Sequence, residues 1–279
     1  MSLGLFSILF AGSLAAGALG GALGMAGGIF VVPLLTLVAG ASFPDAVAVS
    51  LVSVVACSCA SAPQFLTAGL TNLRLAVVLE VATAFGALVG VLVVGAIPRP
   101  VLYGIFAVVL LVSALQMAAG RNDRGPRHPP RQRPRLSGAF VDHTGRTVTY
   151  QVVRLPWGVA LMFAAGSLSA LLGIGSGVLK IPAMDAAMRL PIKASSATAN
   201  LMIGVTACGA AAAYLLSGRL DLDLSAPVVL GSLAGSVLGA RFLVRTAARW
   251  LRAVFTTVLL VVAVPMAANA FGLHWGVSA

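Results

Sequence analysis

Charge is scarce in this chain of 279 residues, because only 9% of the residues are Asp, Glu, Lys or Arg. A soluble domain carries about 25% of these residues, so the composition excludes a soluble fold. Hydrophobic residues make up 59% of the chain, and the mean hydropathy is +1.04. Strand-like alternation is absent outside one loop, so the apolar runs of about 20 residues predict membrane-spanning helices.

Histidine and cysteine are also few, with three residues of each. His128, His143 and His274 lie in the polar connector or the tail, away from any useful cluster of Ser, Cys or carboxylate side chains. This placement argues against a metal centre and against a hydrolytic centre. The cysteines imply no disulfide framework. We therefore predict no metal, no cofactor and no enzymatic activity, since an intramembrane enzyme would need a catalytic constellation that this chain lacks.

No Lys or Arg precedes Arg74. A cleavable signal peptide needs a basic leader, so residues 1–24 are expected to remain in the protein and to span the membrane.

The net charge of +11 comes largely from two clusters of arginines. Eight arginines lie in the loop 120–155, and four more lie between Arg241 and Arg252. Basic loops beside apolar helices mark the cytoplasmic side of a membrane, where contact with anionic lipids is a secondary effect. No aromatic residues are interleaved with these arginines to stack on bases, so nucleic acid is not an expected partner.

The chain is organised around the stretch 24–33, GMAGGIFVVP, which returns as GIGSGVLKIP at 173–182. Six of the twelve glycines between positions 17 and 104 meet a glycine 149 residues later, where chance would give about 1.3. The protein is therefore a duplication. Glycines release the backbone from helical restraint, and paired glycine-interrupted apolar segments are the best sequence pointer to the substrate site of a transporter.

The repeat divides the chain into three parts. Residues 1–119 form transmembrane repeat 1, residues 120–155 form a basic connector, and residues 156–279 form transmembrane repeat 2. In repeat 1 the apolar pattern predicts helices over 3–23, 29–39, 46–66, 73–95 and 101–119. In the connector, β-forming residues at 139–142 and 147–153 flank a turn at 143–146 that contains Gly, which predicts a small hairpin outside the membrane.

Charge placement predicts how the repeats are oriented. If the connector is cytoplasmic, each repeat needs an odd number of crossings to bring the cluster from Arg241 to Arg252 to the same side. We therefore expect an all-α polytopic membrane protein with two inverted repeats, glycine-broken first segments and both termini external to the plasma (inner) membrane. The pattern leaves open whether the broken segments are re-entrant or cross fully.

These motifs resemble the TauE/SafE family of membrane transporters. The resemblance rests on the paired glycine-rich turns that end in Pro33 and Pro182, on the run AVAVSL at 46–51, and on the basic connector with its Phe140-Val141-Asp142 hairpin. Ala26 and Ser176 depart from a strict run of glycines in the two turns. The resemblance implies export of sulfite or of small organosulfur anions such as sulfonates, coupled to an ion gradient.

The residues around the turns point to an anion independently. A helix that restarts after Gly28, in the turn that also contains Gly27, or after Gly177 would present free N–H groups and a positive dipole end, and Ser176 adds a hydroxyl donor. Lys180 lies three residues beyond Gly177, in apolar sequence. A cation inside the membrane costs at least about 2.5 kcal/mol, so it predicts a substrate contact unless its ammonium reaches the surface or pairs with Asp185.

Other polar residues inside helices are weaker candidates. Glu80 is either a proton-coupling carboxylate or a side chain shielded near the cytoplasmic rim. The residues Ser50, Gln64, Thr198 and Asn200 either line the substrate pathway or hydrogen-bond neighbouring helices. Cys59 and Cys208 are related by the repeat and could meet near its axis, where thiols would contact a sulfur substrate or a soft metal. The alternative is that they are small buried apolar residues.

The sequence thus predicts a secondary transporter that exports a small sulfur-containing anion by alternating access. The alternatives are a permease for another small anion or solute and a membrane scaffold without transport. The scaffold explains neither a buried lysine nor paired backbone breaks. The expected partners are the anionic substrate, the lipid bilayer, a coupling proton or other ion, and a second copy of the chain in a homodimer.

Overall fold

A computed structural model describes residues 3–93, 136–141, 145–172, 176–216 and 221–246, with single residues between 108 and 115 and between 250 and 264. Its helices are α1 (Leu3–Leu23), α2 (Gly28–Val38), α3 (Phe43–Thr67), α4 (Leu73–Val93), α6 (Leu155–Leu172), α7 (Gly177–Pro182), α8 (Ile192–Leu216) and α9 (Leu222–Arg245). A π-helix, Ala183–Ala187, follows α7 directly. Five of these helices, α1, α3, α4, α8 and α9, are long and apolar enough to cross a membrane.

The predicted helices of repeat 1 agree with the structure to within three residues at the ends that it describes. The prediction over 3–23 matches α1, and 29–39 and 46–66 correspond to α2 and α3. Helix α3 begins earlier than predicted because Ser42 accepts a hydrogen bond from the Asp45 N–H and caps it, with Pro44 in its first turn. The end of the predicted helix 73–95 and most of 101–119 lie outside the described residues.

Helix boundaries recur along the chain with the spacing that the glycines predict. Helices α3 and α8 are both 25 residues long, and both of their ends are 149 residues apart. The same spacing separates the last residues of α1 and α6 and the first residues of α4 and α9. Helix α7 and the π-helix together cover residues 177–187, which is the range of α2 shifted by 149 residues. The two halves of the sequence therefore form the same succession of elements.

Helix packing follows the same correspondence. Helix α1 packs along α9, and their counterparts α6 and α4 pack along each other. A methyl group built on Gly235 would lie 2.0 Å from the Leu14 carbonyl oxygen, and one on Gly86 would lie 2.0 Å from the Phe163 carbonyl oxygen. These contacts are equivalent in the two halves. In each, the absence of a side chain lets two helix backbones touch.

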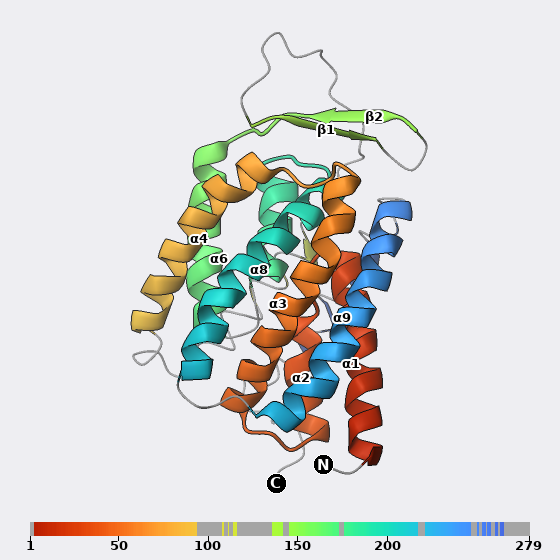
Figure 1. Cartoon of the computed structure of the whole chain (residues 1–279). Coiled ribbons are helices and arrows are strands. Elements are labelled where there is room, and N and C mark those ends of the chain that lie inside the picture. The colour runs from red at the N-terminus through yellow and green to blue at the C-terminus, as the bar shows by residue number, and fades with distance from the viewer. Residues whose placement is uncertain are drawn as a thin grey trace.

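The two strands β1 (Gly138–Val141) and β2 (Thr147–Tyr150) form the predicted hairpin, which lies across one end of the bundle, opposite the start of α1 (Figure 1). Strand β2 ends earlier than the predicted 147–153, because the Val153 N–H bonds the Met188 carbonyl instead of a strand. Burial raises the pKa of the Tyr150 phenol, and a hydrogen bond from Asn72 opposes this shift.

Asn72 fastens the hairpin to the helices. Its side-chain amide donates to the Leu136 carbonyl at 2.9 Å and to the Tyr150 hydroxyl at 3.3 Å, and its Oδ1 accepts from the Leu75 N–H at the start of α4. Its own N–H donates to the Thr198 hydroxyl of α8 at 3.1 Å. The hairpin is thus tied to the beginnings of two helices.

Charges separate between the two ends of the bundle. At the end away from the hairpin, acidic residues lie at helix N-termini, where the helix dipole favours them: Asp45 in the first turn of α3, Asp221 at the N-cap of α9 and Asp223 in its first turn. At the hairpin end, Lys193 of α8 donates to the Val244 carbonyl in the last turn of α9 at 3.2 Å. The described basic residues of the hairpin and of the helix ends beside it are Arg74, Arg146, Arg154, Arg189, Lys193, Arg241 and Arg245.

Candidate functional site

The glycine-rich segment of repeat 1 interrupts the helix between α1 and α2. Gly24, Ala26 and Gly27 have φ angles of 74°, 54° and 74°, which lie in the left-handed region. Every residue from Gly24 to Gly28 is buried. Gly27 stands at the N-cap of α2, where no side chain caps the helix, so its first turn depends on other groups for its N–H partners.

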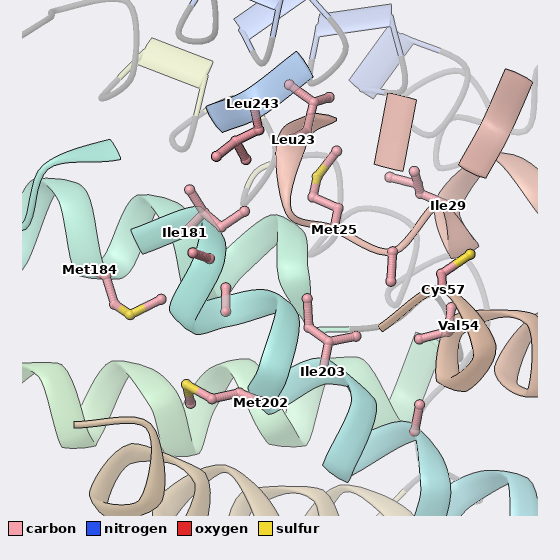
Figure 2. Close-up of a cluster of buried hydrophobic side chains, with 14 of the residues drawn as sticks. Leu23, Met25, Ile29, Val54, Cys57, Ile181, Met184, Met202, Ile203 and Leu243 are labelled. Carbon is pink, nitrogen blue, oxygen red and sulfur yellow. The ribbon is translucent and has the colours of Figure 1, made fainter. Parts of the chain in front are cut away.

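This segment meets the start of α7 from repeat 2. A methyl group on Gly177 would lie 3.1 Å from the Cα of Met25 and 2.6 Å from the Ile203 side chain. In Figure 2 the Met25 side chain lies inside the bundle, between Leu23 and Ile203. The start of the predicted second turn, residues 173–175, lies outside the described residues. Its described end, Ser176 and Gly177, contacts the turn of repeat 1 through Gly177.

The Ser176 hydroxyl is 1% exposed and has no hydrogen-bond partner within the described chain. Such a group normally finds a partner in a folded protein, so this hydroxyl is available to a water or to a ligand oxygen.

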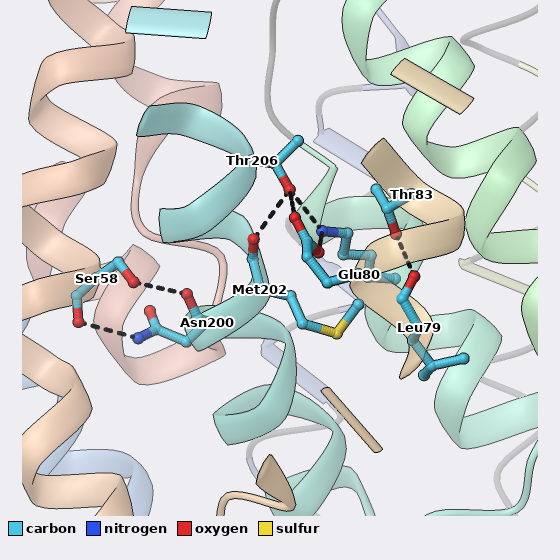
Figure 3. Close-up of polar contacts among 8 residues, drawn as sticks. Ser58, Leu79, Glu80, Thr83, Asn200, Met202 and Thr206 are labelled. Carbon is cyan, nitrogen blue, oxygen red and sulfur yellow. Dashed lines mark hydrogen bonds and ion pairs between the residues drawn. The ribbon is translucent and has the colours of Figure 1, made fainter. Parts of the chain in front are cut away.

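Lys180 is fully buried, and its ammonium forms an ion pair with Glu80 of α4, with 2.9 Å between Nζ and Oε2 (Figure 3). The ammonium also donates to the Thr206 hydroxyl of α8 at 3.0 Å. That hydroxyl contacts the second carboxylate oxygen of Glu80, so Thr206 bridges the two charges. The pairing with Asp185 that the sequence suggested as an alternative is wrong, because Lys180 pairs with Glu80.

A second polar contact joins α3 to α8 (Figure 3). The Ser58 hydroxyl donates to the Asn200 carbonyl at 2.7 Å, and the Asn200 side-chain amide donates to the Ser61 hydroxyl at 2.9 Å. These bonds fix the amide, and its Oδ1 is left buried without a donor within the described chain. Asn200 thus holds two helices together and offers one free acceptor.

The remaining predicted site residues lie in different places. Ser50 donates to the Gly28 carbonyl at 3.2 Å and so supports the turn, whereas Thr198 holds the loop before α4. Gln64 is half-buried, and its Oε1 has no partner in the described part of the chain. Cys59 and Cys208 are exposed on the outside of their helices, and the buried thiol is that of Cys57.

Sequence reasoning missed the bridging residue Thr206 and the pairing of the two charges. One signal was available for the pairing, because Glu80 is the one glutamate in the chain and lies, like Lys180, in an apolar segment. Opposite charges inside a membrane protein pair with each other. Nothing in the sequence marks Thr206 among the other hydroxyl residues.

Five described helices that are long and apolar enough to cross a membrane indicate a multi-pass membrane protein. The chain belongs to the sulfite exporter TauE/SafE family, whose sequence profile matches residues 9–266. The family resemblance read from the sequence is thereby confirmed, and the protein is a membrane transporter.

Two relatives from Bacillus subtilis (strain 168) carry names that agree with this class. "Probable membrane transporter protein YunE" is 25% identical over 245 residues, which cover 84% of this chain and 87% of the relative. "Probable membrane transporter protein YdhB" is 26% identical over 223 residues, which cover 80% and 84%. No solved structure matches the chain.

Proposed function

We propose that this transporter exports a small sulfur-containing anion, sulfite or an organosulfonate, across the plasma membrane. The observation that carries the proposal is the buried ammonium of Lys180, three residues beyond the point where Gly177 meets the turn of repeat 1. A buried cation beside unwound main chain attracts an oxyanion. The name of the family supports a sulfur oxyanion as the substrate.

The ligand set that we propose is narrower than the one the sequence predicts. It consists of the main chain at Gly27 and Gly28, the hydroxyl of Ser176 next to Gly177, and Lys180. Ser176 supports this choice because its hydroxyl is buried without a partner in the described chain.

We further propose that the anion crosses by alternating access between two inverted halves. Helices α1, α3 and α9 run toward the hairpin end of the bundle, and their counterparts α6, α8 and α4 run away from it (Figure 1). Opposite directions for equivalent helices support inverted repeats, in which the substrate site lies between the halves near mid-membrane.

The separation of charge supports a cytoplasmic hairpin and external termini, because basic loops are retained in the cytoplasm. Single cysteines placed at the exposed positions Thr149 and Asp223, in a chain without its native cysteines, test this orientation. In intact cells a membrane-impermeant maleimide should label Asp223→Cys, and it should label Thr149→Cys only after the cells are opened. The reverse pattern would refute the orientation.

Transport into proteoliposomes tests the substrate class. Labelled sulfite and a short alkanesulfonate should exchange through the wild type by counterflow, and Lys180→Ala should reduce this exchange by about tenfold or more, since a buried charge contact is worth several kcal/mol. Size-exclusion chromatography of Lys180→Ala controls for folding. Equal transport by a folded Lys180→Ala would exclude Lys180 as a ligand, and exchange of other solutes alone would favour a different permease.

A further inference from the structure

The ion pair between Lys180 and Glu80 is formally neutral, and it lies inside the bundle between α4, α7 and α8. The lysine side chain is 0% exposed and the glutamate side chain 12% exposed, so Glu80 retains a narrow contact with its surroundings. Lys180 directs one N–H to Glu80 and another to Thr206. An anion that reaches the ammonium must therefore compete with a carboxylate already bound to it.

The groups that face this pair are few. Helix α6, which packs along α4, carries no titratable side chain, and α4 itself offers Arg74 one residue from its start. Helix α8 contributes Thr206 at the pair and carries Lys193, Cys208 and Tyr214 elsewhere along its length, and the π-helix after α7 carries Asp185. Among the described residues, Glu80 is the carboxylate in contact with Lys180.

The cluster joins α4 of repeat 1 to α7 and α8 of repeat 2, and the place that the repeat relates to it carries no charge. A spacing of 149 residues relates Lys180 to Val31, Glu80 to Val229 and Thr206 to Cys57. The charged cluster therefore exists once in the described structure, although the helices around it exist twice.

The high free-energy cost of a net charge in the membrane interior restricts which protonation and ligand states the cluster can adopt. The empty site is neutral when Lys180 is positive and Glu80 is negative. If a monovalent anion joined Lys180 while Glu80 stayed ionised, the site would carry a net negative charge in a low-dielectric interior, which is costly. The site is neutral again if Glu80 takes up a proton.

Resting on the function proposed above, we propose that Glu80 binds a proton whenever Lys180 binds the anion, so that a single proton travels with each monovalent anion and both forms of the carrier that cross are neutral. The proton is added to the Glu80 carboxylate, which releases the Lys180 ammonium to the anion. Both ligands leave together, and the ion pair re-forms. Thr206 is a positioning residue, because it contacts both charges without carrying one.

Glu80→Gln tests this scheme, because the amide keeps the shape of the side chain and mimics its protonated form. The loaded carrier remains neutral in this variant, so counterflow exchange should continue at a rate within about threefold of the wild type. The empty carrier then holds an unpaired ammonium, so net efflux should fall by about tenfold or more. Arg74→Gln is the matched control, since it removes an exposed charge from the same helix and should leave both rates unchanged.

Proton uptake supplies a second readout. In weakly buffered detergent solution, binding of a short alkanesulfonate, which stays a monoanion throughout, should remove one proton from solution per anion in the wild type and none in Glu80→Gln. Wild-type affinity should weaken as the pH rises, because binding takes up a proton, and the affinity of Glu80→Gln should not depend on pH.

The outcomes separate the two proposals. If Glu80→Gln retains the proton uptake and the net efflux of the wild type, the proton scheme is wrong and the proposed substrate class stands. If the wild type transports neither sulfite nor sulfonate, the proposed function fails. Proton uptake measured with any other anion that the wild type exchanges then decides the scheme separately.

Discussion

Lys180→Met should lower the free energy of unfolding by about 3 kcal/mol, because it leaves the Glu80 carboxylate inside the bundle without its cation. Adding Glu80→Gln in the same chain should recover most of this loss, since the second substitution removes the unpaired charge. The stability of the double variant should therefore exceed that of the single variant. Both variants should fail in transport, because neither retains the cation.

Thermal unfolding in detergent, followed by circular dichroism, measures this cycle of substitutions. The wild type, both single variants and the double variant together give the coupling between the two residues. If the destabilisation of the double variant equals the sum of the destabilisations of the two single variants, the coupling is zero, and the ammonium of Lys180 and the carboxylate of Glu80 do not pair in the folded protein.

Gly235→Leu should prevent α1 and α9 from packing, with loss of folded monodisperse protein. Even a methyl group at this position would lie 2.0 Å from the Leu14 carbonyl oxygen and 2.8 Å from the Ala18 nitrogen, both of which belong to the backbone of α1. Backbone atoms cannot rotate away, so the helices must separate. Gly235→Ala should cost about 1–3 kcal/mol by the same mechanism.

Gly209→Ala is the control for this prediction. Gly209 lies in α8 with no heavy atom within 4 Å of a built methyl group, so alanine should be neutral or should stabilise the helix by about 0.5–1 kcal/mol. Yield and elution profile in detergent report the leucine variant, and thermal unfolding reports the alanine variants. Equal stability of Gly235→Ala and Gly209→Ala would contradict the close approach of α1 and α9.

Local signals in the sequence were sufficient for the helices of repeat 1 at the ends that the structure describes. The start of α4 at Leu73 follows from apolar length, and the end of α1 at Leu23 follows from the glycines after it. The hairpin follows from alternation around Gly145. The sequence did not predict the π-helix after Pro182, because widening a helix by one residue per turn leaves no periodic signature in five residues.

The candidate site could be predicted only in part, because its members meet through tertiary structure. Lys180 and Glu80 each stood out as a charge in apolar sequence, but they are 100 residues apart, and no local rule pairs them. Thr198 carries a hydroxyl that could line a substrate pathway, but this hydroxyl binds the Asn72 N–H in the loop before α4. The face of the helix on which a residue lies decides whether it lines a pathway or packs elsewhere. Cys59 lies on the exposed face of α3, whereas Cys57, two residues earlier, is buried.

The burial of both lysines has a practical consequence. Lys180 is 0% exposed and Lys193 is 3% exposed, and these are the two lysines of the chain. Amine-directed reagents therefore meet no accessible lysine in the folded bundle. Any acylation of Lys180 under native conditions would record an opening in which the helices part, so mass spectrometry of labelled peptides can time that opening without an engineered labelling site.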